Sequence, residues 1–310
     1  MIRKQQIKSL VLVLLISIFI GCKPDGKKQE GKQLKVVTTT TMLTDLVNQI
    51  GKDAIQVQGL MGSGVDPHLY KASEGDVSKL FNADVVFYVG LHLEGKLVEV
   101  FEKMERSKTN TVAVAEVLPK NELIGSTYFA SNYDPHIWFN VDFWKQIAEH
   151  TTTELQKADP KNAAYFEANS KAYVKELEAL KIALNETINT LPQEKRVLVT
   201  AHDAFNYFGA AFGFEVVGLQ GLSTATEAGV QDVQELAKYI IEHEVKAIFV
   251  ESSVPKRTIE ALQASVRSKG HEVAIGGTLY SDALGTKGTV EGTYLGMFRY
   301  NVKTIVNALR

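Results

Sequence analysis

The chain has a single cysteine, Cys22, among its 310 residues, and charge of neither sign predominates. One thiol cannot form an intramolecular disulfide, and it leaves no set of thiolates to bind a metal ion. Lys and Arg number 34 against 36 Asp and Glu, and no basic stripe stands out beyond the N-terminus. This charge balance gives no electrostatic footprint for nucleic acid, so we predict no nucleic-acid partner.

Several catalytic motifs are also missing. The sequence has no G-x-x-x-x-G-K-[ST] loop, so the chain is not itself an ATPase. It has no G-x-S-x-G nucleophile elbow and no H-E-x-x-H helix. No pair of carboxylates is placed for acid–base catalysis. We therefore predict that the protein is not an enzyme.

The apolar run near the N-terminus, Leu10–Ile20, is too short for a stop-transfer helix. It follows a basic start and directly precedes Gly21-Cys22, so residues 1–21 are predicted to be a signal peptide. A thiol at this place resembles a bacterial lipobox, which makes Cys22 the predicted lipidation site. An ordinary signal peptide with an incidental cysteine is the alternative. Residues 22–33 are predicted to be a solvated, lipidated tether, on a protein exported to the cell membrane or periplasm.

Beyond the tether, short β-branched runs alternate with helical patterns, which favours parallel sheets covered by helices. The chain is predicted to be α/β, with two small lobes that each contain a mainly parallel four-stranded sheet and flanking helices. The N-terminal metal-binding lobe is expected at residues 34–158 and the C-terminal metal-binding lobe at residues 192–310. The expected strands are Leu34–Thr38, Ile55–Leu60, Asp84–Val89, Thr111–Ala115, Arg196–Thr200, Glu215–Leu219, Ala247–Glu251 and Glu272–Ile275. Among the expected helices are Leu93–Met104 and Thr289–Leu309.

Residues 159–191 are predicted to form a long helix that links the two lobes. No glycine occurs between Pro160 and Leu191, and apolar residues recur there at helical spacing. An ordinary long helix packed on one lobe is the alternative. A single helical connection has few places to absorb a wide hinge motion, so we expect metal loss to cause only a small tilt of the lobes. The glycine-rich loop from Gly276 to Gly288 is expected to loosen at the same time.

Three histidines and one aspartate are the candidate metal ligands. His68 and His136 each end an Asp-Pro-His triplet, in which proline stiffens the backbone before the ligand. His202 and Asp282 each follow an apolar strand, where α/β proteins place their binding groups. Three imidazoles and one carboxylate suit Zn²⁺ or Mn²⁺. Each triplet could alternatively be a loop turn with a surface histidine. His202 could instead be hydrogen-bonded to its neighbour Asp203, and Asp282 could be a residue that caps a helix or forms a turn.

Two further residues are possible participants. Glu251 ends the strand Ala247–Glu251 and is interpreted as a support of the ligands or of the lobe interface. His92 precedes an expected helix and is a possible accessory ligand. Because metal binding needs neutral imidazoles, we expect affinity to fall below about pH 6.

The chain resembles the cluster A-I metal-binding lipoproteins of bacterial ABC importers, and it looks closest to the TroA type. The resemblance covers nearly all of the mature chain and is carried, among others, by Val65-Asp66-Pro67-His68, Asp134-Pro135-His136-Ile137-Trp138, Thr200-Ala201-His202-Asp203 and Tyr280-Ser281-Asp282-Ala283-Leu284-Gly285. It implies two α/β lobes bridged by one long helix, with His68, His136, His202 and Asp282 binding the metal between them.

The resemblance also implies a function in metal import. The chain would be an extracytoplasmic solute-binding lipoprotein that captures Zn²⁺, Mn²⁺ or both and delivers the ion to a permease with its ATPase subunit. Its lipid would hold it at the bilayer, and we expect a monomer. The histidine at position 202, the carboxylate at 282 and the missing His-rich loop place the chain between the zinc and manganese groups. Iron also stays open as cargo, and a secreted zinc hydrolase or a secondary role as a surface adhesin are the alternative functions.

Overall fold

The protein is described by a computed structural model, which covers residues 33–106 and 110–310. The predicted signal peptide, Cys22 and all of the tether except Gln33 lie outside the described residues. Within the described ranges, no helix has both the length and the apolar character needed to cross a membrane.

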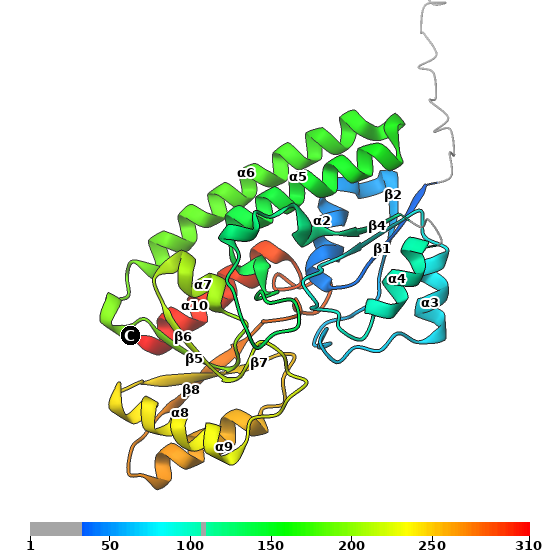
Figure 1. The fold of residues 1–310 in the computed structure, drawn as a ribbon. Helices are drawn as coiled ribbons and strands as arrows, with labels where there is room; N and C mark the ends of the chain where they lie inside the picture. Colours follow the sequence, from blue (N-terminus) through cyan, green and yellow to red (C-terminus); the bar gives the residue numbers. More distant parts are fainter. Residues whose placement is uncertain (1–32, 107–109) are drawn as a thin grey trace, which may run out of the picture. The chain divides into compact units, whose positions relative to one another are not determined.

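The first half of the chain forms a four-stranded parallel sheet in the order β2-β1-β3-β4 (Figure 1). Its strands are β1 (Leu34–Thr38), β2 (Ile55–Gly59), β3 (Val85–Tyr88) and β4 (Thr111–Ala113). Its helices are α2 (Thr41–Gly51), α3 (Glu74–Phe81), α4 (Val98–Arg106) and α5 (Val141–Ala158). We call this sheet with these helices the N-lobe.

The second half repeats this arrangement, with a parallel sheet in the order β6-β5-β7-β8. Its strands are β5 (Val197–His202), β6 (Glu215–Gln220), β7 (Ala247–Glu251) and β8 (Ala274–Leu279). Its helices are α7 (Asn206–Phe212), α8 (Val230–Glu242), α9 (Arg257–Ser268) and α10 (Tyr294–Leu309). We call this part the C-lobe. The predicted fold class, two parallel four-stranded sheets with flanking helices, is confirmed.

The long helix α6 (Ala163–Ile188) connects the lobes, and the short 3-10 turn Pro160–Asn162 precedes it. At about 1.5 Å per residue it extends roughly 39 Å. It lies beside α5 and also packs against α2 and α10, so it contacts helices of both lobes rather than one (Figure 1). Its buried face consists largely of the apolar residues that recur at helical spacing in the sequence: Phe166, Tyr173, Leu177, Leu180, Leu184 and Ile188.

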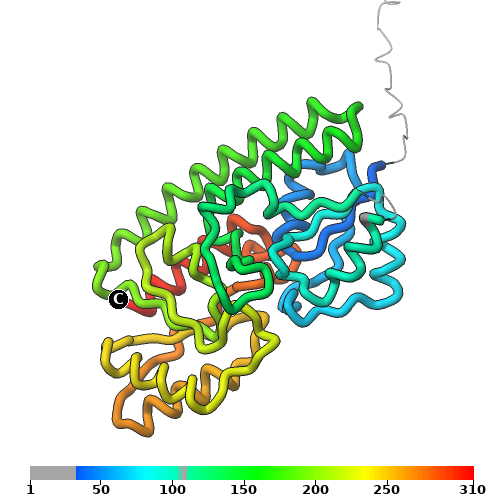
Figure 2. Tube along the Cα trace, in the orientation of Figure 1, coloured from blue at the N-terminus to red at the C-terminus, as the bar shows by residue number. Residues whose placement is uncertain are grey.

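One hydrophobic core runs beneath α6 and is shared by both lobes. It contains Val36 and Phe87 from the first sheet, Phe249 from the second sheet, and Phe298 from α10. The outer face of each sheet has its own smaller apolar cluster. The trace in Figure 2 shows the last segment, from β8 through α10, returning against the N-lobe, where the Tyr294 amide donates to Asp45. The two sheets are therefore joined by buried packing as well as by a helix.

Three expected boundaries are wrong. The helix expected at Leu93 begins at Val98, because Leu91 and His92 adopt left-handed φ angles of 51° and 64° and the chain turns before it can coil. The last helix begins at Tyr294, not Thr289, and Thr293 caps it by accepting from the Gly296 amide.

The third wrong boundary concerns the glycines expected to begin a mobile loop. Gly276 and Gly277 lie within β8, which continues to Leu279. A Cβ at Gly276 would stand 2.7 Å from both Ala308 and the Phe249 ring, so this glycine lets β8 approach its neighbours closely. The expected loop of residues 276–288 is therefore shorter, because it starts after β8.

Candidate metal centre

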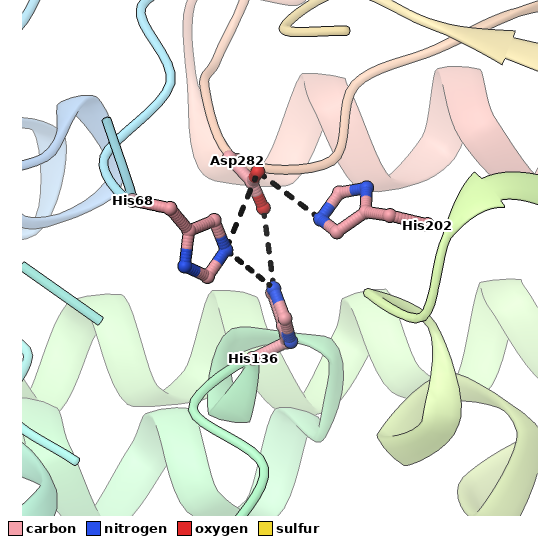
Figure 3. Close-up of side chains that lie close together, drawn as sticks. All are labelled: His68, His136, His202 and Asp282. Atoms are coloured by element: carbon pink, nitrogen blue, oxygen red, sulfur yellow. Dashed lines mark hydrogen bonds and ion pairs between the residues drawn. The ribbon is translucent and has the colours of Figure 1, made fainter. Parts of the chain in front are cut away.

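Four side chains from distant parts of the sequence meet where the two lobes face each other (Figure 3). His68 lies in the loop after β2, and His136 precedes the 3-10 turn Ile137–Phe139. His202 is the last residue of β5, and Asp282 follows β8. The N-lobe thus supplies two imidazoles, and the C-lobe supplies one imidazole and the carboxylate.

The four groups face one another through their ligand atoms. His68 Nε2 lies 3.3 Å from His136 Nε2 and 3.9 Å from an oxygen of Asp282. The Asp282 oxygens also lie 3.5 Å from His136 Nε2 and 3.2 Å from His202 Nε2. Four donors bound at about 2.1 Å around a tetrahedral ion would stand roughly 3.4 Å apart. The four separations given above lie on both sides of that value, and all four ligand atoms lie within 4.8 Å of one another, so the group could hold one ion.

The centre is buried and its hydrogen bonding is incomplete. His136 and His202 are fully buried, Asp282 is 1% exposed and His68 is 4% exposed. Within the described ranges, His202 Nε2 and both Asp282 oxygens have no hydrogen-bond partner of regular geometry. Buried polar atoms rarely lack a hydrogen-bond partner, because burial removes their bonds to water and no other bond replaces them. Donor atoms that converge without partners are typical of a site that binds a cation.

Asp282 does not act as a helix cap or turn former. Neither of its oxygens accepts from a main-chain amide in the described ranges. Its loop is held by other groups: the Trp138 indole donates to the Ser281 carbonyl at 2.9 Å, and Thr41 Oγ1 accepts from the Leu284 amide at 2.8 Å. The carboxylate is therefore free to point at the three imidazoles.

Two further carboxylates orient the imidazoles. Asp134 Oδ1 accepts from both the His136 amide and the His136 ring at Nδ1, at 2.9 and 2.7 Å. Glu251 contacts His202 in a similar way: one oxygen accepts from its amide at 2.9 Å, and the other lies 2.6 Å from Nδ1. Each contact leaves Nε2 directed at the centre, as in carboxylate–histidine–metal arrangements.

Electrostatics set different charge states for two of the imidazoles. Burial lowers the pKa of His68 to about 3, despite the opposing charge of Asp282. Burial acts against charge on His202 as well, but the carboxylates of Glu251 and Asp282 outweigh it and raise the His202 pKa well above its usual range. Burial likewise opposes the ionised Asp282, yet the facing imidazoles, His202 above all, hold the Asp282 pKa below its usual range. Without an ion, His202 is therefore an imidazolium paired with Asp282.

The remaining sequence candidates have separate places. Glu251 is buried at the Nδ1 side of His202, on β7, and is not one of the four converging residues. His92 is exposed, and its ring lies 6.2 Å from Phe129, so it is not part of the group either.

Sequence reasoning missed Asp134 and Phe129 as parts of this centre. The aspartate stands two residues before a candidate histidine, and that spacing was the available signal. The Phe129 ring lies nearly perpendicular to the His68 ring, with the ring centroids 6.4 Å apart, a contact that no local pattern reveals.

Comparison with known proteins agrees with this geometry. The family model described as "Zinc-uptake complex component A periplasmic" (ZnuA) matches residues 36–308. The chain is 47% identical over 306 residues to the manganese-binding lipoprotein MntA of Bacillus subtilis, covering 98% of this chain and 99% of that protein. It is 48% identical over 280 residues to the zinc-binding protein TroA of Treponema pallidum, covering 90% of each.

A solved structure shows the same fold. The periplasmic zinc-binding protein TroA from Treponema pallidum superposes with a TM-score of 0.87 at 47% identity, covering 89% of this chain and 99% of that chain. Taken with the family model and the two relatives, this likeness shows that the chain belongs to the ZnuA family of metal-uptake proteins.

Proposed function

We propose that this protein is the extracytoplasmic solute-binding component of an ABC importer and captures a Zn²⁺ or Mn²⁺ ion with His68, His136, His202 and Asp282. The observation that carries the proposal is the centre itself: four ligand atoms converge, and those of His202 and Asp282 are buried with no hydrogen-bond partner in the described ranges. Membership of a metal-uptake family supports the same reading.

Capture fits the geometry better than catalysis. A catalytic zinc keeps a coordination position open for water and is held by three protein ligands. Here four protein groups surround the position, and none is more than 4% exposed. A substrate larger than the ion has no approach to such a centre. The relatives are named as binding proteins, and neither their names nor the geometry favours a hydrolase or an adhesin.

The donor set suits both proposed ions. Three nitrogens and one oxygen bind zinc readily, and a carboxylate also suits manganese. One relative is named for manganese and the other for zinc. Because nearly every nitrogen and oxygen site prefers Zn²⁺ to Mn²⁺, the affinity order alone does not identify the cargo in the cell. Metal analysis of protein taken from its native host would identify it.

The partners follow from the role. Solute-binding proteins of this family deliver their cargo to a permease that is driven by an ATPase subunit. We propose further that the chain works as a monomer and is anchored to the membrane by a lipid on Cys22. Relatives named as lipoproteins support the anchor.

Isothermal titration of metal-stripped protein tests the proposal. We expect one ion to bind per chain at submicromolar concentration, and His136→Ala to lose at least tenfold in affinity. His243→Ala is the matched control, because His243 is exposed at the C-terminal end of α8 and is not one of the four converging residues. If the parent protein bound neither ion below micromolar concentration, the proposed function would be wrong.

A further inference from the structure

The two Asp-Pro-His triplets are built alike, and each reaches across to the C-lobe. In both, one aspartate oxygen accepts from the amide of the histidine, at 2.8 Å for Asp66 with His68 and 2.9 Å for Asp134 with His136. In both, the other oxygen accepts from a C-lobe side chain. Asp134 accepts from Asn206 Nδ2 at 3.1 Å, and Asp66 accepts from the Thr224 hydroxyl at 2.5 Å.

The two cross-lobe bonds lie in different surroundings. Asn206 begins α7 and is flanked by Phe205 and Tyr207, which belong to the core shared by both lobes. Shared packing therefore holds the Asp134–Asn206 contact together. Thr224 stands in the segment between β6 and α8, whose neighbouring apolar residues belong to the outer cluster of the C-lobe. The loop that carries His68 also contacts the C-lobe at Ser63, whose hydroxyl donates to the Leu284 carbonyl at 2.9 Å, so the cross-lobe contacts cited for this loop are polar.

We propose that Thr224 is the latch that closes the metal site: its hydroxyl joins the C-lobe to Asp66 and, through that carboxylate, fixes the main chain of His68. The inference rests on the proposed function and adds a positioning residue to it. Thr224 is 8% exposed and 158 residues from Asp66, so the bond forms only when the lobes are together.

His68 is the ligand on which such a latch acts most effectively. It is the most exposed of the four, at 4%, and it lies in the loop that follows β2 of the N-lobe. When the lobes tilt apart at this end, Asp66 loses Thr224, and the segment that carries His68 gains freedom. Release of the ion would then begin at His68, while the shared core still holds His136.

Chelator-induced release of the ion, followed by stopped flow, tests the latch on the full chain in detergent. Partners that orient metal ligands typically change affinity by about tenfold or more, so we expect Thr224→Val to release Zn²⁺ or Mn²⁺ about tenfold faster. Thr224→Ser keeps the hydroxyl and should release the ion within about twofold of the parent rate. Thr226→Val makes the same change at an exposed position of the same segment and should leave the rate unchanged.

The outcomes separate the latch from the proposed function. Metal binding by the parent with fast release by Thr224→Val alone supports the latch. Release by Thr224→Val at the parent rate overturns it. Equal acceleration in Thr224→Val and Thr226→Val also overturns it, because valine would then act by loosening the segment. Failure of the parent to bind any ion is a different result, and it contradicts the proposed function instead.

Discussion

Metal binding should release one proton per ion at neutral pH, and the source of that proton should be His202. In the metal-free protein its imidazolium lies between two carboxylates, with Nδ1 2.6 Å from Glu251 and Nε2 3.2 Å from Asp282. These charges raise the His202 pKa well above its usual range. A metal ion needs the Nε2 lone pair, so the proton on that atom has to leave, while Nδ1 keeps its own toward Glu251.

The size of the effect follows from the proton count. With one proton displaced, affinity should rise about tenfold for each pH unit, or about 1.4 kcal/mol, as long as the pH is below the His202 pKa. Above that pKa no proton is displaced, and the affinity should level off. His68 is already neutral at pH 7, because burial lowers its pKa to about 3, so it adds no proton near neutral pH. The expected fall in affinity therefore extends across neutral pH and does not begin only near pH 6.

Titration calorimetry in buffers with different ionisation enthalpies measures this proton count directly. We expect a count near one at pH 7 for the parent. Glu251→Gln replaces the charge beside Nδ1 with a neutral amide, so the His202 pKa should fall and the count should decrease. The same variant should lose roughly tenfold to a hundredfold in affinity, since the ring loses its anchor. A count of zero for the parent at pH 7 would refute the assigned charge state.

Three further predictions concern the ligand carboxylate, a packed glycine and the movement of the lobes. Asp282→Ala should lose at least tenfold in metal affinity by calorimetry, while its circular dichroism spectrum stays that of the parent. An affinity equal to that of the parent would show that Asp282 is not a metal ligand. Gly276→Ala should lower the free energy of unfolding, measured with denaturant, by about 1–3 kcal/mol, because the added Cβ would lie 2.7 Å from Ala308 and Phe249. Gly221→Ala is the control and should lower it much less, since a Cβ there has nothing within 4 Å. Removal of the metal should change the radius of gyration by less than about 2 Å in small-angle scattering, because the lobes share a core, and a change of several ångströms would disprove that restraint.

Much of the fold was predictable, because each lobe alternates strand and helix with clear apolar patterns. All eight strands found in the described ranges were expected near their observed positions, and the apolar stripe of α6 identified its buried face. The errors have local causes that a pattern does not contain. The turn at Leu91 and His92 depends on left-handed backbone, and the glycines of β8 are needed for close packing with α10.

The four converging residues were foreseeable from their places at strand ends, but the way they are supported was not. Asp66 and Thr224 are 158 residues apart, and nothing near either residue in the sequence indicates their contact. The charge state of His202 is equally hard to predict from the sequence. It depends on burial and on two carboxylates contributed by other strands and loops, which meet only in the folded protein.

The core beneath α6 has a consequence for how this protein unfolds. Two lobes with the same strand order suggest two units that could be produced separately, yet each would expose at its inner face the apolar residues that now pack against the other. Neither half should be stable alone, and thermal denaturation should show one cooperative transition. An ion bound where the lobes meet then protects the entire chain, by RT ln(1 + [ion]/Kd). Outside the cell, the loaded form would be the more protease-resistant one, and scarcity of the metal would shorten the lifetime of the protein that collects it.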